Sequence, residues 1–320
     1  MNDDFVICVR DVKSGAFIPE PGSTKFLVVP PDKLPSPTQK MKQGDWVEAV
    51  IEEATVVPAT DATPATGDLL VFIHGYNNGQ DAIMERHRLL RADLERIGFK
   101  GAVASYDWPS AESALNYLED RSDAKQTALR LVDDCIALFA SIQRPDCRIN
   151  VHLLAHSTGA YVIREAFDDA DDRPAVAQRN WMVSQIALIG GDISSGSMSE
   201  GNATTESLMR HCVRLTNYSN PYDSVLKLSN VKRLGAAPRV GRVGLPDDAP
   251  QKCVDVDCGP YFHALKEGRA KFVGTFCHSW HIGDPVFAQD LLDTMRGDLD
   301  RNVIPTRATE AGKLTLTKPS

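Results

Sequence analysis

From residue 69 onward, short apolar runs alternate with segments whose apolar residues recur at the period of a helix. The first run, residues 69–73, predicts a buried strand, and residues 80–97 after it predict an amphipathic helix. The same alternation predicts further strands at 102–106, 184–189 and 213–217 and helices at 124–142, 161–167 and 285–295. Alternating strands and helices are typical of a mostly parallel sheet flanked by helices, so we predict an α/β fold.

The first 67 residues have a different pattern. Apolar runs at 5–9, 25–29 and 46–51 predict three strands separated by Pro-rich turns, and a Thr-, Ala- and Pro-rich spacer follows them. We expect antiparallel strands that begin the same sheet, with a small separate β extension as the alternative. The chain is therefore predicted to form a single domain over residues 1–302. Residues 303–320 are a polar C-terminal tail whose composition is compatible with disorder.

The composition argues against several kinds of partner. The net charge of −8 comes from 43 acidic residues against 35 Lys and Arg, without a basic run, which argues against a nucleic-acid groove or an anionic membrane surface. The sequence has no apolar stretch of about 18 residues and no signal-like start, so we expect a cytoplasmic protein without a membrane anchor. The seven cysteines are scattered, and the closest pair, Cys253 and Cys258, lacks a matching pair of ligands. We therefore expect reduced thiols and no metal site.

A candidate nucleophile follows an apolar run that begins at residue 151. The run ends in the letters AHSTG, with Ser157 at their centre, and a segment of helical pattern comes directly after it. A serine on so tight a strand-to-helix turn has a strained backbone, and the residues two before and two after it must be small. Ala155 and Gly159 meet this requirement, so Ser157 is predicted to stand on a nucleophile elbow. An ordinary turn with serine as the helix N-cap is the alternative.

A nucleophilic serine needs a histidine as general base and a carboxylate that fixes the tautomer of that histidine. The chain supplies Asp223 and then His278 after Ser157, each close to the predicted end of a strand or the start of a helix. Asp192 also follows a predicted strand and is kept as the alternative acid, and His281 is kept as the alternative base. We favour Asp223 because it directly precedes a new helical run, and His278 because it precedes the loop that leads into the final helix.

The tetrahedral intermediate of acyl transfer also needs two backbone donors for its oxyanion. We expect one from the amide of Thr158, the residue after the nucleophile. The other is expected from the sequence HGYNNG after the strand at 69–73, where the Tyr76 amide is favoured and the Asn77 amide is the next choice. This sequence is also typical of an ordinary turn. His74 and His152 lie in or beside predicted strands, where we expect structural roles.

Three stretches together resemble the α/β-hydrolase superfamily and, within it, a group of poorly characterised bacterial serine hydrolases that are lipase-like. They are VFIHGYNN at 71–78, LAHSTG at 154–159 and HSWH at 278–281, similar to the HGYNN oxyanion loop, the HSxG elbow and the late histidine of that group. The resemblance covers residues 68–295 and departs at Ala155, where glycine is usual. It implies Ser157 as nucleophile, His278 as base and Asp223 as acid. It does not imply a substrate.

We therefore expect an α/β-hydrolase fold whose site cleaves a carboxylic ester with a small or medium acyl group. No metal or organic cofactor is needed for this reaction, and the expected partner is a small-molecule ester. A peptidase, a thioesterase and an acyltransferase are alternatives among enzymes, and a non-catalytic binding module is the alternative from another class. Residues 108–121 are expected either to line or cover the acyl pocket or to pack as an exposed loop on the core. The oligomeric state is not predicted.

Overall fold

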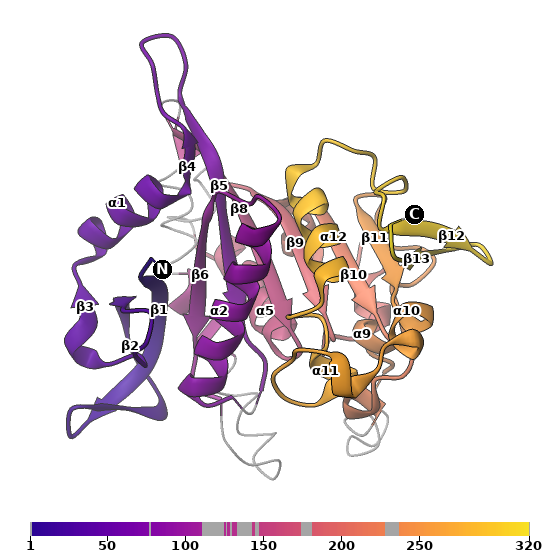
Figure 1. Cartoon of the computed structure of the whole chain (residues 1–320), viewed down its shortest axis with the longest axis horizontal. Helices are drawn as coiled ribbons and strands as arrows, with labels where there is room; N and C mark the ends of the chain where they lie inside the picture. The colour runs from indigo at the N-terminus through magenta and orange to yellow at the C-terminus, as the bar shows by residue number, and fades with distance from the viewer. Residues whose placement is uncertain are drawn as a thin grey trace.

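The molecule is built around one large sheet, whose centre is parallel (Figure 1). The computed structural model describes residues 2–76, 78–110, 147–173, 181–227 and 237–319, with 125, 127, 128, 130–132, 143 and 144. From one side to the other, the parallel strands are β11 (Cys253–Asp257), β10 (Cys212–Ser219), β9 (Val183–Ile189), β8 (Cys147–His156), β5 (Ala65–Ile73), β6 (Ala102–Asp107) and β1 (Asp4–Lys13). The predicted α/β class is confirmed.

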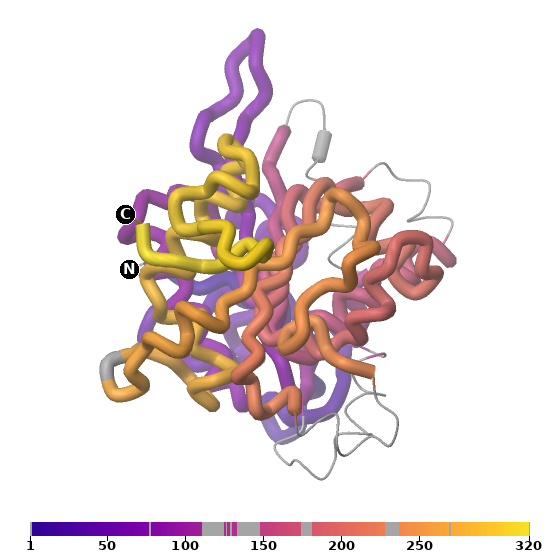
Figure 2. Tube along the Cα trace, turned by 90° about the vertical axis from the view of Figure 1, so that its right-hand side faces the viewer, coloured from indigo at the N-terminus to yellow at the C-terminus, as the bar shows by residue number. Residues whose placement is uncertain are grey.

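The N-terminal strands belong to this sheet. β1 pairs in parallel with β6, and β2 (Ala16–Val29) and β3 (Lys40–Met41) then extend the sheet antiparallel. β4 (Thr55–Val57) pairs with the start of β5, and the connection between them extends away from the rest of the protein (Figures 1 and 2). β7 (Gln143–Arg144) pairs antiparallel with β8.

The predicted strand at residues 46–51 is wrong, because this run lies inside helix α1 (Gln43–Ala54). Its β-branched residues favoured an extended conformation. The buried residues of the helix are Trp46, Val50 and Ala54, which recur every four residues on one helical face. The indole nitrogen of Trp46 donates a hydrogen bond of 2.9 Å to the carbonyl of Leu27, and this contact fastens the helix to β2.

Each face of the sheet has its own core, as the alternation of side chains along β5 requires. Leu69, Val71 and Ile73 pack in a cluster with residues of α1 and α5 (Gly159–Asp171). Leu70 and Phe72 point to the other face, where they pack with residues of α2 (Gln80–Arg96) and α12 (Pro285–Arg296). Figure 1 shows α2 and α12 side by side in front of the sheet.

Short helices fill the connections at the two ends of the strands. They are η1 (Pro37–Gln39), η3 (Ser195–Met198), α7 (Glu206–Arg210), α9 (Val240–Val243), α10 (Gly259–Ala264), η4 (Glu267–Arg269) and α11 (Phe276–Ser279). Most of the helix predicted at 124–142, and residues 111–121 of the segment expected to line or cover the acyl pocket, lie outside the described residues. Trp108, which begins that segment, is fully buried.

The polar tail is ordered, contrary to the disorder that its composition allowed. β12 (Arg307–Glu310) and β13 (Lys313–Leu316) form a hairpin, and β13 pairs with β11 at the edge of the sheet. The Arg307 guanidinium lies 2.6 Å from the carboxylate of Asp290 on α12, and both side chains are fully buried. This long-range ion pair holds the tail against the body of the protein, and no local pattern in the tail predicts it.

Candidate functional site

Ser157 stands on a strained turn between β8 and α5, as the small neighbouring residues predicted. Its φ is 56°, in the left-handed region that is costly for a residue with a side chain. Its amide donates to the carbonyl of Ile189 on β9, and its carbonyl accepts from the amide of Asp192, both at 3.0 Å. A Cβ at Gly159 would lie 2.5 Å from the carbonyl oxygen of Ile73, so the turn needs glycine there. Neighbouring strands therefore hold the serine in its strained conformation.

His278 and Asp223 are joined by a short hydrogen bond at the carboxyl ends of the strands. Nδ1 of His278, on α11, lies 2.6 Å from Oδ2 of Asp223, which follows β10. The other carboxylate oxygen of Asp223 accepts a hydrogen bond of 3.0 Å from the amide of Leu226, so both oxygens of the carboxylate are hydrogen-bonded. The side-chain amide of Asn220 donates to the carbonyl of Cys277 at 2.9 Å and ties the two segments together.

The imidazole of His278 packs directly beside the elbow. Its ring centroid is 4.7 Å from that of His156, the residue before Ser157. A Cβ at Gly190, which has φ 55°, would lie 2.9 Å from the Cε1 atom of His278. Among the described residues, no hydrogen bond joins the hydroxyl of Ser157 to His278. Catalytic hydrogen bonds in unliganded enzymes are often long and tighten when substrate binds.

The two alternative residues lie in other surroundings. Asp192 is buried and forms an ion pair with Arg239, at 3.1 Å between the closest atoms. His281 is 1% exposed and stacks on Trp280, with ring centroids 4.1 Å apart. Burial, and then the neighbouring His278, lower the pKa of His281 to about 3. Neither ring nitrogen of His281 has a hydrogen-bond partner in the part of the chain that the structure describes.

The loop after β5 lies against the nucleophile. A Cβ at Gly75 would lie 2.6 Å from Cβ of Ser157, so the backbone of this loop reaches the serine only because residue 75 is glycine. The side-chain amide of Asn78 donates to the carbonyls of Gly75 and Tyr76 at 2.8 and 2.9 Å. Both carbonyls are thus turned toward Asn78. Thr158 is the N-cap of α5, where the first amides of a helix lack intrahelical acceptors. Asn77 lies outside the described residues.

His74 and the N-terminal strand support this loop from behind. Trp108 donates its amide to Nε2 of His74, so Nδ1 carries the proton and donates to the Gly75 carbonyl. Burial lowers the pKa of His74, which favours this neutral form. Arg10 on β1 lies 2.6 Å from Asp107. Burial alone would raise the pKa of Asp107, but the charge of Arg10 outweighs it and holds that pKa well below its usual range.

Residues that the sequence analysis did not select also hold the site. Arg86 on α2 donates to the side-chain oxygen of Asn78 and to the carbonyl of Val273. Its burial could have been predicted, because it lies three residues after Ile83 and four before Leu90 on the apolar stripe of α2. Its contact with Val273 could not have been predicted, since Val273 is 187 residues away along the chain.

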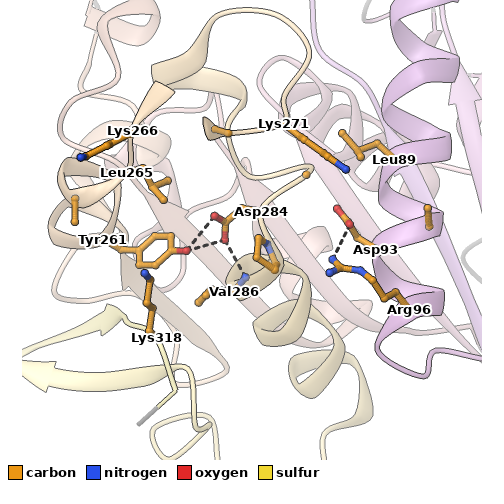
Figure 3. Close-up of a pocket in the computed structure, with 15 residues that line it drawn as sticks. Leu89, Asp93, Arg96, Tyr261, Leu265, Lys266, Lys271, Asp284, Val286 and Lys318 are labelled. Carbon is orange, nitrogen blue, oxygen red and sulfur yellow. Dashed lines mark hydrogen bonds and ion pairs between the residues drawn. The ribbon is translucent and has the colours of Figure 1, made fainter. Parts of the chain in front are cut away.

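A pocket of about 760 Å³ lies between α2, α10 and the start of α12 (Figure 3). Tyr261 donates its hydroxyl to the carboxylate of Asp284 there, and Lys266, Lys271 and Lys318 also line it. None of the predicted triad residues lines this pocket. In the described residues, no group of three or more His, Cys, Asp or Glu side chains could hold a metal ion. Likewise, no described helix is long and apolar enough to span a bilayer.

A parallel sheet with helices on both faces and a strained serine at a strand-to-helix turn define the α/β-hydrolase class. The chain belongs to the family described as alpha/beta hydrolase of unknown function (DUF900), which it matches over residues 52–254. No match to a curated protein was found.

Three solved structures are distantly similar to this chain. The chain is similar to a cutinase-like protein from Cryptococcus sp., with 12% identity, a TM-score of 0.36 and coverage of 74% of this chain and 98% of that chain. It is also similar to Aspergillus fumigatus lipase B, with 11% identity, a TM-score of 0.44 and coverage of 93% and 67%. For Est1E from Butyrivibrio proteoclasticus, the values are 12%, 0.37, 73% and 89%.

Proposed function

We propose that this protein is a serine hydrolase that cleaves a carboxylic ester through an acyl-enzyme on Ser157. In this proposal His278 is the general base, Asp223 is the acid of the triad, and the amides of Thr158 and Tyr76 form the oxyanion hole. The observation that carries it is the hydrogen bond of 2.6 Å between His278 and Asp223. The ring of His278 packs beside the elbow. Residues with a strained backbone cluster at active sites, and a base held by a carboxylate beside a strained serine is the arrangement that acyl transfer needs.

The proposed reaction begins with attack of the Ser157 hydroxyl oxygen on the ester carbonyl carbon. Nε2 of His278 takes the hydroxyl proton, and the Asp223 carboxylate stabilises the resulting imidazolium. The carbonyl oxygen becomes an oxyanion that accepts hydrogen bonds from the two backbone amides. When the tetrahedral intermediate collapses, the bond to the alkoxy group breaks and His278 gives its proton to the leaving alcohol.

Hydrolysis of the acyl-enzyme repeats these steps with water as the nucleophile. His278 removes a proton from the water, the hydroxide oxygen attacks the acyl carbon, and Ser157 leaves with the proton returned by His278. The products are a carboxylic acid and the regenerated enzyme. A small or medium acyl group is proposed because the sequence has no long apolar segment that could serve as a lid.

A panel of p-nitrophenyl esters from acetate to decanoate tests this function, with a thioester and a peptide amide of the same acyl group beside it. We expect hydrolysis of the shorter esters and its loss in Ser157→Ala. Ser184→Ala is the matched control, because Ser184 lies near the amino end of β9, away from the elbow. Preferential cleavage of the thioester or amide would replace the ester assignment. Equal activity of Ser157→Ala and the wild type would contradict the mechanism.

A further inference from the structure

Arg86 is a buried cation that forms no ion pair with the residues the structure describes. Its side chain is 5% exposed. Burial lowers the pKa of Arg86 to about 10, so the guanidinium is still charged at neutral pH. A buried charge is costly unless it is paired or hydrogen-bonded, and the hydrogen bonds of Arg86 to Asn78 and Val273 offset this cost.

The guanidinium bridges the loop beside Ser157 and the segment that leads into α11. One end donates to the side-chain oxygen of Asn78, whose amide nitrogen in turn holds the carbonyls of Gly75 and Tyr76. The other end donates to the carbonyl of Val273 through Nε at 3.2 Å and Nη2 at 2.8 Å. Val273 lies three residues before α11, the helix that carries the proposed base. One planar group thus joins the proposed oxyanion loop to the segment that leads into α11.

The space for the guanidinium depends on a glycine. Gly274 has φ 103°, a conformation that favours glycine, and a Cβ there would lie 2.6 Å from Nη2 of Arg86. The same Cβ would lie 3.1 Å from the hydroxyl oxygen of Ser279, the residue after His278. Arg86 therefore fills a site that is shaped on one side by the α11 segment and on the other by Asn78.

We propose that Arg86 is a positioning residue that fixes the Tyr76 amide for stabilisation of the oxyanion. The inference rests on the proposed function, because it assigns a role within the same site. Through Asn78, Arg86 holds the Gly75 carbonyl and so sets the direction of the Tyr76 amide, which belongs to the same planar peptide unit. A lysine keeps the charge but cannot donate to both partners with a planar fork.

The test compares Arg86→Lys with Arg96→Lys, using the ester that the wild type cleaves best. Arg96 is an exposed arginine on the same helix. A catalytic group displaced by about 1 Å costs about 100-fold in rate. We therefore expect Arg86→Lys to lower kcat about 10- to 100-fold, with KM within about twofold of the wild type, while Arg96→Lys changes neither. The thermal midpoint of each variant is measured as a check on folding.

Asn78→Asp supplies a second variant, since it keeps an acceptor for Arg86 but loses the donor to the loop carbonyls. We expect a similar fall in kcat, and we expect the double variant to lose much less than the product of the two single losses. A kcat within twofold of the wild type in Arg86→Lys would overturn the inference while leaving the proposed function intact. A fall in kcat of Arg86→Lys with an equal rise in KM would also overturn the inference. The same holds if the losses in the double variant equal the product of the two single losses. A wild type that neither cleaves esters nor reacts with a fluorophosphonate at Ser157 would instead overturn the proposed function.

Discussion

Replacing Asp223 by asparagine keeps the shape of the side chain and removes its charge. The structure sets the scale, because the carboxylate oxygen lies 2.6 Å from Nδ1 of His278 and Asp223 is only 1% exposed. Coulomb's law with an effective dielectric constant of about 20 gives about 6 kcal/mol for unit charges at that distance. Each factor of ten in rate corresponds to about 1.4 kcal/mol. Loss of this stabilisation of the imidazolium can therefore lower kcat by at most about 10⁴- to 10⁵-fold.

We expect Asp223→Asn to lower kcat about 10³- to 10⁴-fold, because the amide also favours the wrong tautomer of His278. The assay is ester hydrolysis at saturating substrate, with the free energy of unfolding measured in urea for each variant. Asp192→Asn is the matched control, since Asp192 is buried but pairs with Arg239, and its kcat should stay within about tenfold of the wild type. A larger loss in Asp192→Asn than in Asp223→Asn would refute the reasoning and move the acid to Asp192.

Three further predictions concern stability and the loop beside the nucleophile. The folded pKa of His281 is about 3, below its ordinary value of 6.5, so its neutral form adds stability above pH 6.5 that is lost as the pH falls toward 3. In His281→Phe, the free energy of unfolding should therefore fall less steeply over that pH range, by up to about 1.4 kcal/mol per pH unit. Urea titrations at several pH values measure this slope, and a slope equal to that of the wild type would argue against a neutral buried ring. Arg307→Leu leaves the carboxylate of Asp290 buried and unpaired and should destabilise the protein by about 3–5 kcal/mol; a loss below 1 kcal/mol, roughly, would show that the tail is not held as described. Gly75→Ala puts a methyl group 2.6 Å from Cβ of Ser157 and should lower kcat about 100-fold, and full activity would place the loop elsewhere.

The elbow could be predicted from the sequence because its requirements are local. A strand that ends in a serine between small residues defines the turn by itself, and the structure gives Ser157 the expected left-handed φ of 56°. The alternating apolar runs likewise predicted the central strands, since burial on a sheet follows directly from the spacing of side chains. The helix at Gln43–Ala54 was missed because four-residue spacing and β-branched composition pointed to different structures, and packing against the sheet decided between them.

Contacts between distant segments could not be predicted in this way. Arg86 bonds a carbonyl 187 residues away, Arg10 reaches Asp107 across 97 residues, and Arg307 holds α12 from within the tail. Each is a charged side chain that is buried because the fold supplies partners for its donors. Arg86 and Arg10 both contact Asn78 in the loop after β5, and Arg307 holds the tail at one end of the sheet.

The most direct test of the proposed function is the reaction of the purified protein with a fluorophosphonate, because this reagent needs an activated serine but no knowledge of the substrate. The modified peptide is identified by mass spectrometry, with Ser157→Ala and Ser184→Ala as parallel samples. We predict one phosphonate on the peptide that contains Ser157, the same labelling in Ser184→Ala, and none in Ser157→Ala. A folded wild-type protein that remains unlabelled, or is labelled equally in Ser157→Ala, would contradict the assignment of Ser157 as an activated nucleophile.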